Sequence, residues 1–126
     1  KTNCCDFQND GQSCPKTNDC NSPGWLELDY AGVKFSESTT ALTWSKLKSS
    51  IYCNKDVLGF AYGTPGVVGH VVAVKGYVTV GGTNYVVLND PWSPCDGSER
   101  LITYDEYQNP AGSSTHWRTW YGISKK

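Results

Sequence analysis

The sequence has no methionine, no excess of basic residues and no long apolar run. Its 11 lysines and arginines against 12 acidic residues give a net charge of −1, so the chain has no cationic surplus to displace counterions from a nucleic acid. No stretch approaches the roughly 20 apolar residues of a membrane-spanning helix. We therefore expect neither a nucleic-acid nor a membrane partner. Because neither an initiator methionine nor an apolar leader stands at Lys1, we expect a processed chain.

What the sequence does contain is typical of a globular protein. Hydrophobic residues make up 38% of its 126 positions, and aromatic residues 13%. A chain of this length can enclose one modest core. We therefore expect residues 1–126 to form a single unit.

Six cysteines are many for so short a chain. Four lie in residues 1–24, a stretch of mostly small and polar residues that cannot hold itself together by burial. Disulfides are therefore expected, and with them a secreted or extracellular location. A zinc site is the alternative, which the adjacent cysteine pair disfavours because it fits tetrahedral ligation poorly, and we expect no metal and no cofactor. The predicted disulfide cysteines, whose fifteen possible pairings stay open, are Cys4, Cys5, Cys14, Cys20, Cys53 and Cys95.

The order of the local patterns predicts an α+β fold. Residues 25–55 are expected to be helical, with a short helix at 25–32 and a stronger one from the N-cap Thr43 to Tyr52. After residue 56, short apolar or β-branched runs alternate with clusters of glycine, proline, asparagine or aspartate. This alternation predicts an antiparallel sheet with hairpin connections. The expected strands are 57–62, 71–74, 85–88, 101–104 and 117–121.

A candidate catalytic pair lies on two of these strands. His70 begins one strand and Asp90 ends the next, so a hairpin brings both to one rim of the sheet, where a carboxylate would orient the imidazole. A regular two-residue turn at 81–82 would place His70 opposite Ser93, three positions and roughly 10 Å past Asp90. Contact therefore requires a wider hairpin or a β-bulge, for which Gly76 is the obvious position.

Three segments carry a family resemblance: residues 69–77 read GHVVAVKGY, residues 85–92 read YVVLNDPW and residues 103–107 read TYDEY. Together with the 43–52 helix and the cysteine-rich 1–24 stretch, they resemble the second half of papain-like cysteine peptidases. The closest likeness is to the secreted bacterial branch, which is similar to bacteriocin-leader-processing peptidases. The resemblance implies a papain-like antiparallel sheet or half-barrel and peptide-bond hydrolysis through a thiolate–imidazolium pair.

The resemblance also assigns roles to individual residues. His70 would be the general base that pairs with a catalytic thiolate, and Asp90 would orient it. Asn89 and Trp92 would support the pair, Trp92 by shielding its hydrogen bond from water. No catalytic role is expected for His116. The residues expected at the substrate rim, on the loop before His70, are Thr64, Gly66 and Gly69.

The nucleophile implied by the resemblance is a cysteine on a segment upstream of Lys1, accompanied there by an oxyanion-hole glutamine. Cys4 and Cys5 are poor candidates, since the acidic, turn-like residues 6–11 disfavour a thiolate. The expected partners are thus an upstream fragment of the same precursor and a peptide or protein substrate. The chain alone is expected to be inactive.

Two alternatives to an enzyme remain open. The first is a non-catalytic binding or toxin-type module on the same scaffold, because a fold does not determine a function. The second is a disulfide-rich adhesin that uses exposed aromatic side chains. The aromatic residues considered for such a surface are Trp117, Trp120 and Tyr121.

Overall fold

The computed structural model describes Leu28, residues 31–64, Gly66 and residues 68–91, then residues 97–110, Gly112 and residues 114–126. The predicted cysteine-rich stretch lies outside the described residues, as do five of the eight residues of the predicted first helix. The described part is a mixed α/β fold with a six-stranded antiparallel sheet and two short helices. The predicted combination of short helices and an antiparallel sheet is confirmed.

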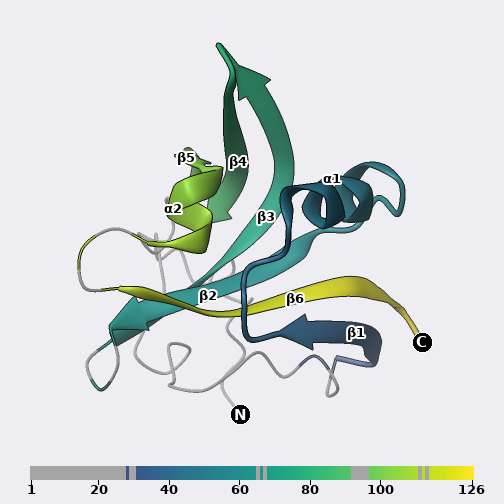
Figure 1. The fold of residues 1–126 in the computed structure, drawn as a ribbon. Coiled ribbons are helices and arrows are strands. Elements are labelled where there is room, and N and C mark those ends of the chain that lie inside the picture. Colours follow the sequence, from purple (N-terminus) through teal and green to yellow (C-terminus); the bar gives the residue numbers. More distant parts are fainter. Residues whose placement is uncertain are drawn as a thin grey trace, which may run out of the picture.

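The sheet has the strand order β1-β6-β2-β3-β4-β5. In Figure 1, β3 curves upward, so that β4 stands at a steep angle to β2, β6 and β1; α1 is seen beside β3 and α2 beside β4. The longer helix has nine residues, and no described helix is long and apolar enough to cross a membrane. The elements are β1 (Val33–Ser38), α1 (Trp44–Tyr52), β2 (Leu58–Thr64), β3 (Val68–Val80), β4 (Thr83–Asp90), β5 (Ser98–Thr103), α2 (Tyr104–Gln108) and β6 (Thr115–Lys125).

Helix α1 begins and ends where its sequence predicts. The Thr43 hydroxyl accepts a hydrogen bond from the Lys46 amide at 3.2 Å, which satisfies one of the unpaired donors of the first turn. Leu47 is fully buried on the inner face of the helix. The amphipathic pattern and the cap together therefore account for this element.

Two elements differ from the prediction. Within residues 25–55, expected to be helical, Val33–Ser38 instead forms the edge strand β1, which pairs with β6. Burial alternates over the first four residues of β1, as in a strand, so the period of two was a usable signal there. Tyr104, expected at the end of a strand, begins α2 because Thr103 and Glu106 form a capping box before it.

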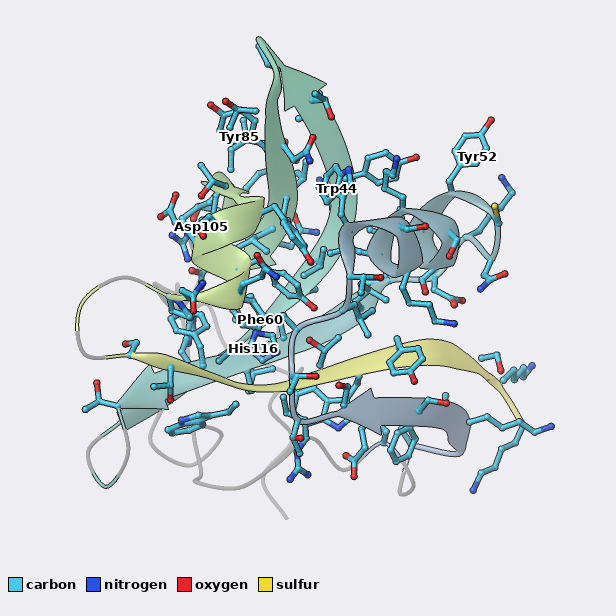
Figure 2. The ribbon with its side chains drawn as sticks, in the orientation of Figure 1. Trp44, Tyr52, Phe60, Tyr85, Asp105 and His116 are labelled. Carbon is cyan, nitrogen blue, oxygen red and sulfur yellow. The ribbon has the colours of Figure 1, made fainter. Side chains whose placement is uncertain are left out.

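The core lies between the inner face of the sheet and the two helices. Figure 2 shows Phe60 of β2 at its centre, with Trp44 of α1 above it. Trp120 is only 1% exposed, so its predicted place on an exposed aromatic surface is wrong. Each large apolar side chain buried here contributes roughly 1.5–3 kcal/mol to stability. The buried core members are Leu42, Leu47, Leu58, Phe60, Val72, Val74, Val86, Leu88 and Tyr107.

Candidate active site

His70 and Asp90 lie in direct contact across β3 and β4. The imidazole Nε2 donates a hydrogen bond to the carboxylate Oδ1 over 2.6 Å. The side chain of His70 is 28% exposed and that of Asp90 only 8%. Because a carboxylate accepts only, this bond places a hydrogen on Nε2 and compensates part of the cost of burying the charge. The predicted proximity of the two residues is confirmed.

A β-bulge in β3 makes this contact possible. On the turn side of the bulge Gly76 lies opposite Val87, whereas beyond it Val74 lies opposite Leu88. Side chains alternate between the faces of a strand, so this one-residue shift turns the carboxylate onto the face that carries the imidazole. The predicted bulge at Gly76 is confirmed. It shifts the register by one residue, and a diagonal contact between side chains covers the remaining distance.

Two further residues, which sequence reasoning missed, complete a four-residue cluster. Arg100 of β5 donates from Nε to Oδ2 of Asp90 at 3.0 Å, and its Nη2 forms an ion pair with the same oxygen at 2.9 Å. Its Nη2 also donates to the Tyr62 hydroxyl at 3.3 Å. The Tyr62 ring meets the imidazole edge-to-face, with ring centroids 5.8 Å apart. Tyr62 could have been found as the direct β2 partner of His70, but Arg100 depends on the β4–β5 register.

The charges of the cluster balance around one nearly buried carboxylate. Removing a carboxylate from water costs several kcal/mol unless cations or hydrogen-bond donors replace the water. Asp90 has such a donor on each oxygen: His70 on Oδ1 and Arg100 on Oδ2. Its charge is therefore shared between a permanent cation and a group that can gain a proton.

The predicted rim residues lie around the β2–β3 connection. Thr64 ends β2, and Gly66 has a φ of 74°, a left-handed conformation that favours glycine. Gly69 packs against Trp117 of β6, so closely that a Cβ at this position would lie 2.2 Å from Cζ3 of the indole. Glycine at position 69 is therefore what allows Trp117 to cover the strand beside His70.

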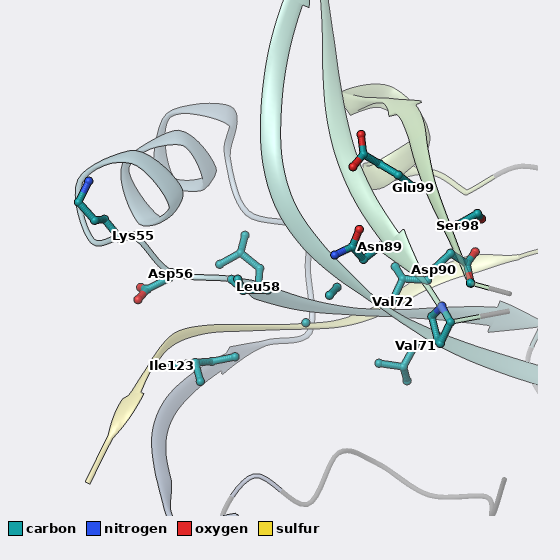
Figure 3. A pocket seen from close by; sticks show the side chains of 15 residues that line it. Lys55, Asp56, Leu58, Val71, Val72, Asn89, Asp90, Ser98, Glu99 and Ile123 are labelled. Atoms are coloured by element: carbon teal, nitrogen blue, oxygen red, sulfur yellow. The ribbon is translucent and has the colours of Figure 1, made fainter. Parts of the chain in front are cut away.

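An apolar groove of about 960 Å³ borders Asp90 (Figure 3). Val71, Ala73 and Ile123 contribute to its wall, and Asn89 lies along it. Asn89 precedes Asp90 on β4 and therefore points to the opposite face of the sheet. The structure thus places Asn89 beside the groove and not in the four-residue cluster. The other predicted supporting residue, Trp92, lies outside the described residues.

Cys53 is the single cysteine among the described residues, and its thiol is free and exposed. The predicted disulfide at Cys53 is therefore wrong. The residue is the C-cap of α1, and Figure 1 shows this helix and the end of β2 on opposite sides of the molecule. The other five cysteines lie outside the described residues. Within the described part of the chain, no three or more histidine, cysteine, aspartate or glutamate residues are grouped to hold a metal ion.

His116 belongs to a separate buried network. Its Nδ1 lies 2.9 Å from the Tyr107 carbonyl and its Nε2 lies 3.0 Å from the Thr119 hydroxyl. The Tyr107 and Thr119 hydroxyls are 2.7 Å apart, and the Leu42 amide donates to Tyr107 at 3.0 Å. One order of donation satisfies every contact and leaves neither hydroxyl hydrogen unpaired: Leu42 to Tyr107, Tyr107 to Thr119, Thr119 to Nε2, and Nδ1 to the carbonyl. That order requires a neutral imidazole.

The surroundings of His116 favour the same neutral form. Burial lowers the pKa of His116, and the hydrogen bond to the Tyr107 carbonyl opposes this effect in part. Nδ1 connects His116 of β6 to α2, and Nε2 contacts Thr119 on its own strand.

The four-residue cluster is therefore the best candidate for chemistry in the described part of the chain. An imidazole held by a carboxylate through one nitrogen is suited to general acid–base catalysis through the other. No protein-family model matches the chain, and neither does any curated protein or solved structure.

Proposed function

We propose that this chain is the His- and Asp-bearing part of a secreted papain-like cysteine peptidase that hydrolyses peptide bonds. The observation that carries the proposal is the 2.6 Å hydrogen bond from His70 Nε2 to Asp90 Oδ1. The motifs around both residues resemble that family, and the antiparallel sheet is compatible with it. His70 is also partly exposed, so a reacting group can approach the ring.

The proposed reaction is acyl transfer. Because Asp90 engages Nε2, the nitrogen that exchanges a proton with the nucleophile is Nδ1. A cysteine thiol transfers its proton to Nδ1, and the thiolate attacks the peptide carbonyl carbon. The intermediate collapses as Nδ1 returns the proton to the leaving amine, and water then hydrolyses the thioester. Asp90 keeps the imidazole oriented and stabilises its charge throughout.

In this proposal, a segment upstream of Lys1 supplies the nucleophilic cysteine and the oxyanion-hole glutamine. His70 lies opposite Tyr62, near the end of β2. Cys53 caps α1, which lies on the other side of the molecule from the end of β2, so it is a poor nucleophile candidate. The partners are therefore the upstream fragment and a peptide or protein substrate.

The test combines the chain with the polypeptide encoded directly before Lys1 and measures thiol alkylation by iodoacetamide at mildly acidic pH. Cys53 is replaced by serine throughout, because its exposed thiol would also react. Peptide mapping identifies the alkylated cysteine. We expect one cysteine of the upstream segment to react and His70→Ala to slow it at least about tenfold, because an isolated thiol of pKa near 8.5 is mostly protonated at this pH.

His116→Gln is the matched control, because the other histidine bonds to Tyr107 and Thr119 and belongs to a different hydrogen-bond network from Asp90. This variant should retain the wild-type alkylation rate. An alkylation rate that is equally slow with and without His70 would refute the peptidase proposal. It would favour a non-catalytic binding module on this scaffold.

A further inference from the structure

The four side chains of the candidate site form a closed ring across four adjacent strands. Tyr62 on β2 lies opposite His70 on β3, and His70 bonds to Asp90 on β4. Asp90 bonds to Arg100 on β5, and Arg100 returns to the Tyr62 hydroxyl. Each residue of the ring thus contacts two others, and Arg100 is the member farthest along the sheet from the imidazole.

The contacts of Arg100 restrict how Asp90 can turn. Nε and Nη2 both approach Oδ2, at 3.0 and 2.9 Å, whereas Oδ1 is the oxygen that His70 contacts. Rotating the carboxylate about its axis would break the charge-assisted hydrogen bond from Nε, which is the stronger kind, and the ion pair with Nη2. The guanidinium is held in turn by the Tyr62 hydroxyl. Oδ1 is therefore kept facing the imidazole.

A lysine could not hold the carboxylate in the same way. An ammonium group is a point charge on a flexible stem, whereas the guanidinium presents its donors in a rigid plane. At position 100 two nitrogens of the plane are used together, because Nε and Nη2 both approach Oδ2 of Asp90 and Nη2 also reaches the Tyr62 hydroxyl. Arg100→Lys keeps the positive charge and removes the fixed plane of donors, whereas Arg100→Gln removes the charge, so the two substitutions separate the effect of charge on Asp90 from the effect of orientation.

We propose that Arg100 is a positioning residue, which holds Asp90 so that Oδ1 accepts from His70 and keeps the imidazole in a single tautomer. The importance of this role for catalysis rests on the proposed peptidase function. The positioning itself is a property of the folded chain. It can be measured without a nucleophile or a substrate.

The experiment follows the His70 ring in the ¹⁵N-labelled full chain by NMR. In the wild type we expect one Nε2–H tautomer and a downfield ring N–H resonance that exchanges slowly with solvent. In both Arg100→Gln and Arg100→Lys we expect a mixture of tautomers and exchange at least about tenfold faster, because losing a hydrogen bond to a charged group corresponds to a factor of about ten or more. Tyr62→Phe removes only the hydroxyl that accepts from Arg100, and it should accelerate exchange of the His70 ring N–H by a smaller factor than the Arg100 substitutions.

The matched control is Arg118→Gln, which breaks another arginine–carboxylate pair between strands, the 3.3 Å contact with Glu37. It should leave the His70 resonance unchanged. The proposal is overturned if Arg100→Gln keeps wild-type exchange, if Arg100→Lys restores it fully, or if the control accelerates it equally. If Arg100→Gln does not fold, Arg100→Lys and Tyr62→Phe decide the question by the same criteria.

The two proposals fail separately. Absence of His70-dependent alkylation with an intact Arg100 effect on the NMR signal would refute the peptidase and leave the positioning role. His70-dependent alkylation with no effect of Arg100 substitution on the NMR signal would support the peptidase and refute the positioning role. If both hold, Arg100→Gln should also slow alkylation of the upstream cysteine by about tenfold.

Discussion

The Tyr107 hydroxyl is the most sharply testable contact of the fold. It is fully buried, accepts from the Leu42 amide at 3.0 Å and lies 2.7 Å from the Thr119 hydroxyl. Tyr107→Phe removes it and leaves both partners buried without this contact. An unsatisfied buried polar group costs about 1–3 kcal/mol, and relaxation of the network recovers part of this. We therefore expect the free energy of unfolding to fall by about 2–3 kcal/mol.

The same short helix provides the control. The Tyr104 hydroxyl donates to the Leu42 carbonyl at 2.6 Å, but the contact is only partly buried, so water can replace the hydroxyl. Tyr104→Phe should therefore cost about 1 kcal/mol or less. Urea denaturation followed by circular dichroism compares the two variants on equal terms. Equal losses, or a larger loss in Tyr104→Phe, would show that burial of the hydroxyl does not set the cost.

Three further predictions concern the same fold. Burial lowers the pKa of His116, so the folded state binds fewer protons than the unfolded chain. The contribution of His116 to the free energy of unfolding is therefore fully present above pH 6.5, the ordinary pKa of histidine, and is lost as the pH falls from there through the lowered pKa. Urea titrations at stepped pH should show a shallower acid loss for His116→Gln, and an unchanged slope would contradict this. Gly69→Ala should cost about 1–3 kcal/mol by overpacking against Trp117. Gly76→Ala on the same strand, where an added Cβ meets only ordinary contacts, should cost less, and equal thermal shifts would contradict the prediction. Thr43→Ala should lower the stability by about 1 kcal/mol in thermal denaturation, and Thr43→Asn should change it very little because asparagine is also a good N-cap. Equal stability of the two variants would contradict a role of the Thr43 cap.

The candidate site was only partly predictable from the sequence. His70 and Asp90 stand at the start of one strand and the end of the next, and antiparallel pairing alone brings such ends together. Glycine at position 76 indicated where the ladder could shift. The size of that shift depends on how the two strands pair along their whole length, so the sequence allowed either face for the carboxylate.

Arg100 shows a different limit. It reaches Asp90 because the β4–β5 register sets Ser98 opposite Asp90 and Arg100 two positions along, on the same face. The composition of the segment between Asp90 and Ser98 does not determine the register of the next strand. A salt bridge between separate strands is therefore visible only after the register is known.

The sequence by itself determined the local features: the capped helix α1, the hairpins between glycine-rich turns, and the rim shared by one imidazole and one carboxylate. These depend on alternation, capping and turn chemistry, which act over a few residues. The tertiary structure decided the bulge register, the edge strand β1, the burial of Trp120 and the Arg100 contact. Each of these depends on contacts between residues distant in sequence, where pairing across the sheet prevails over local preference.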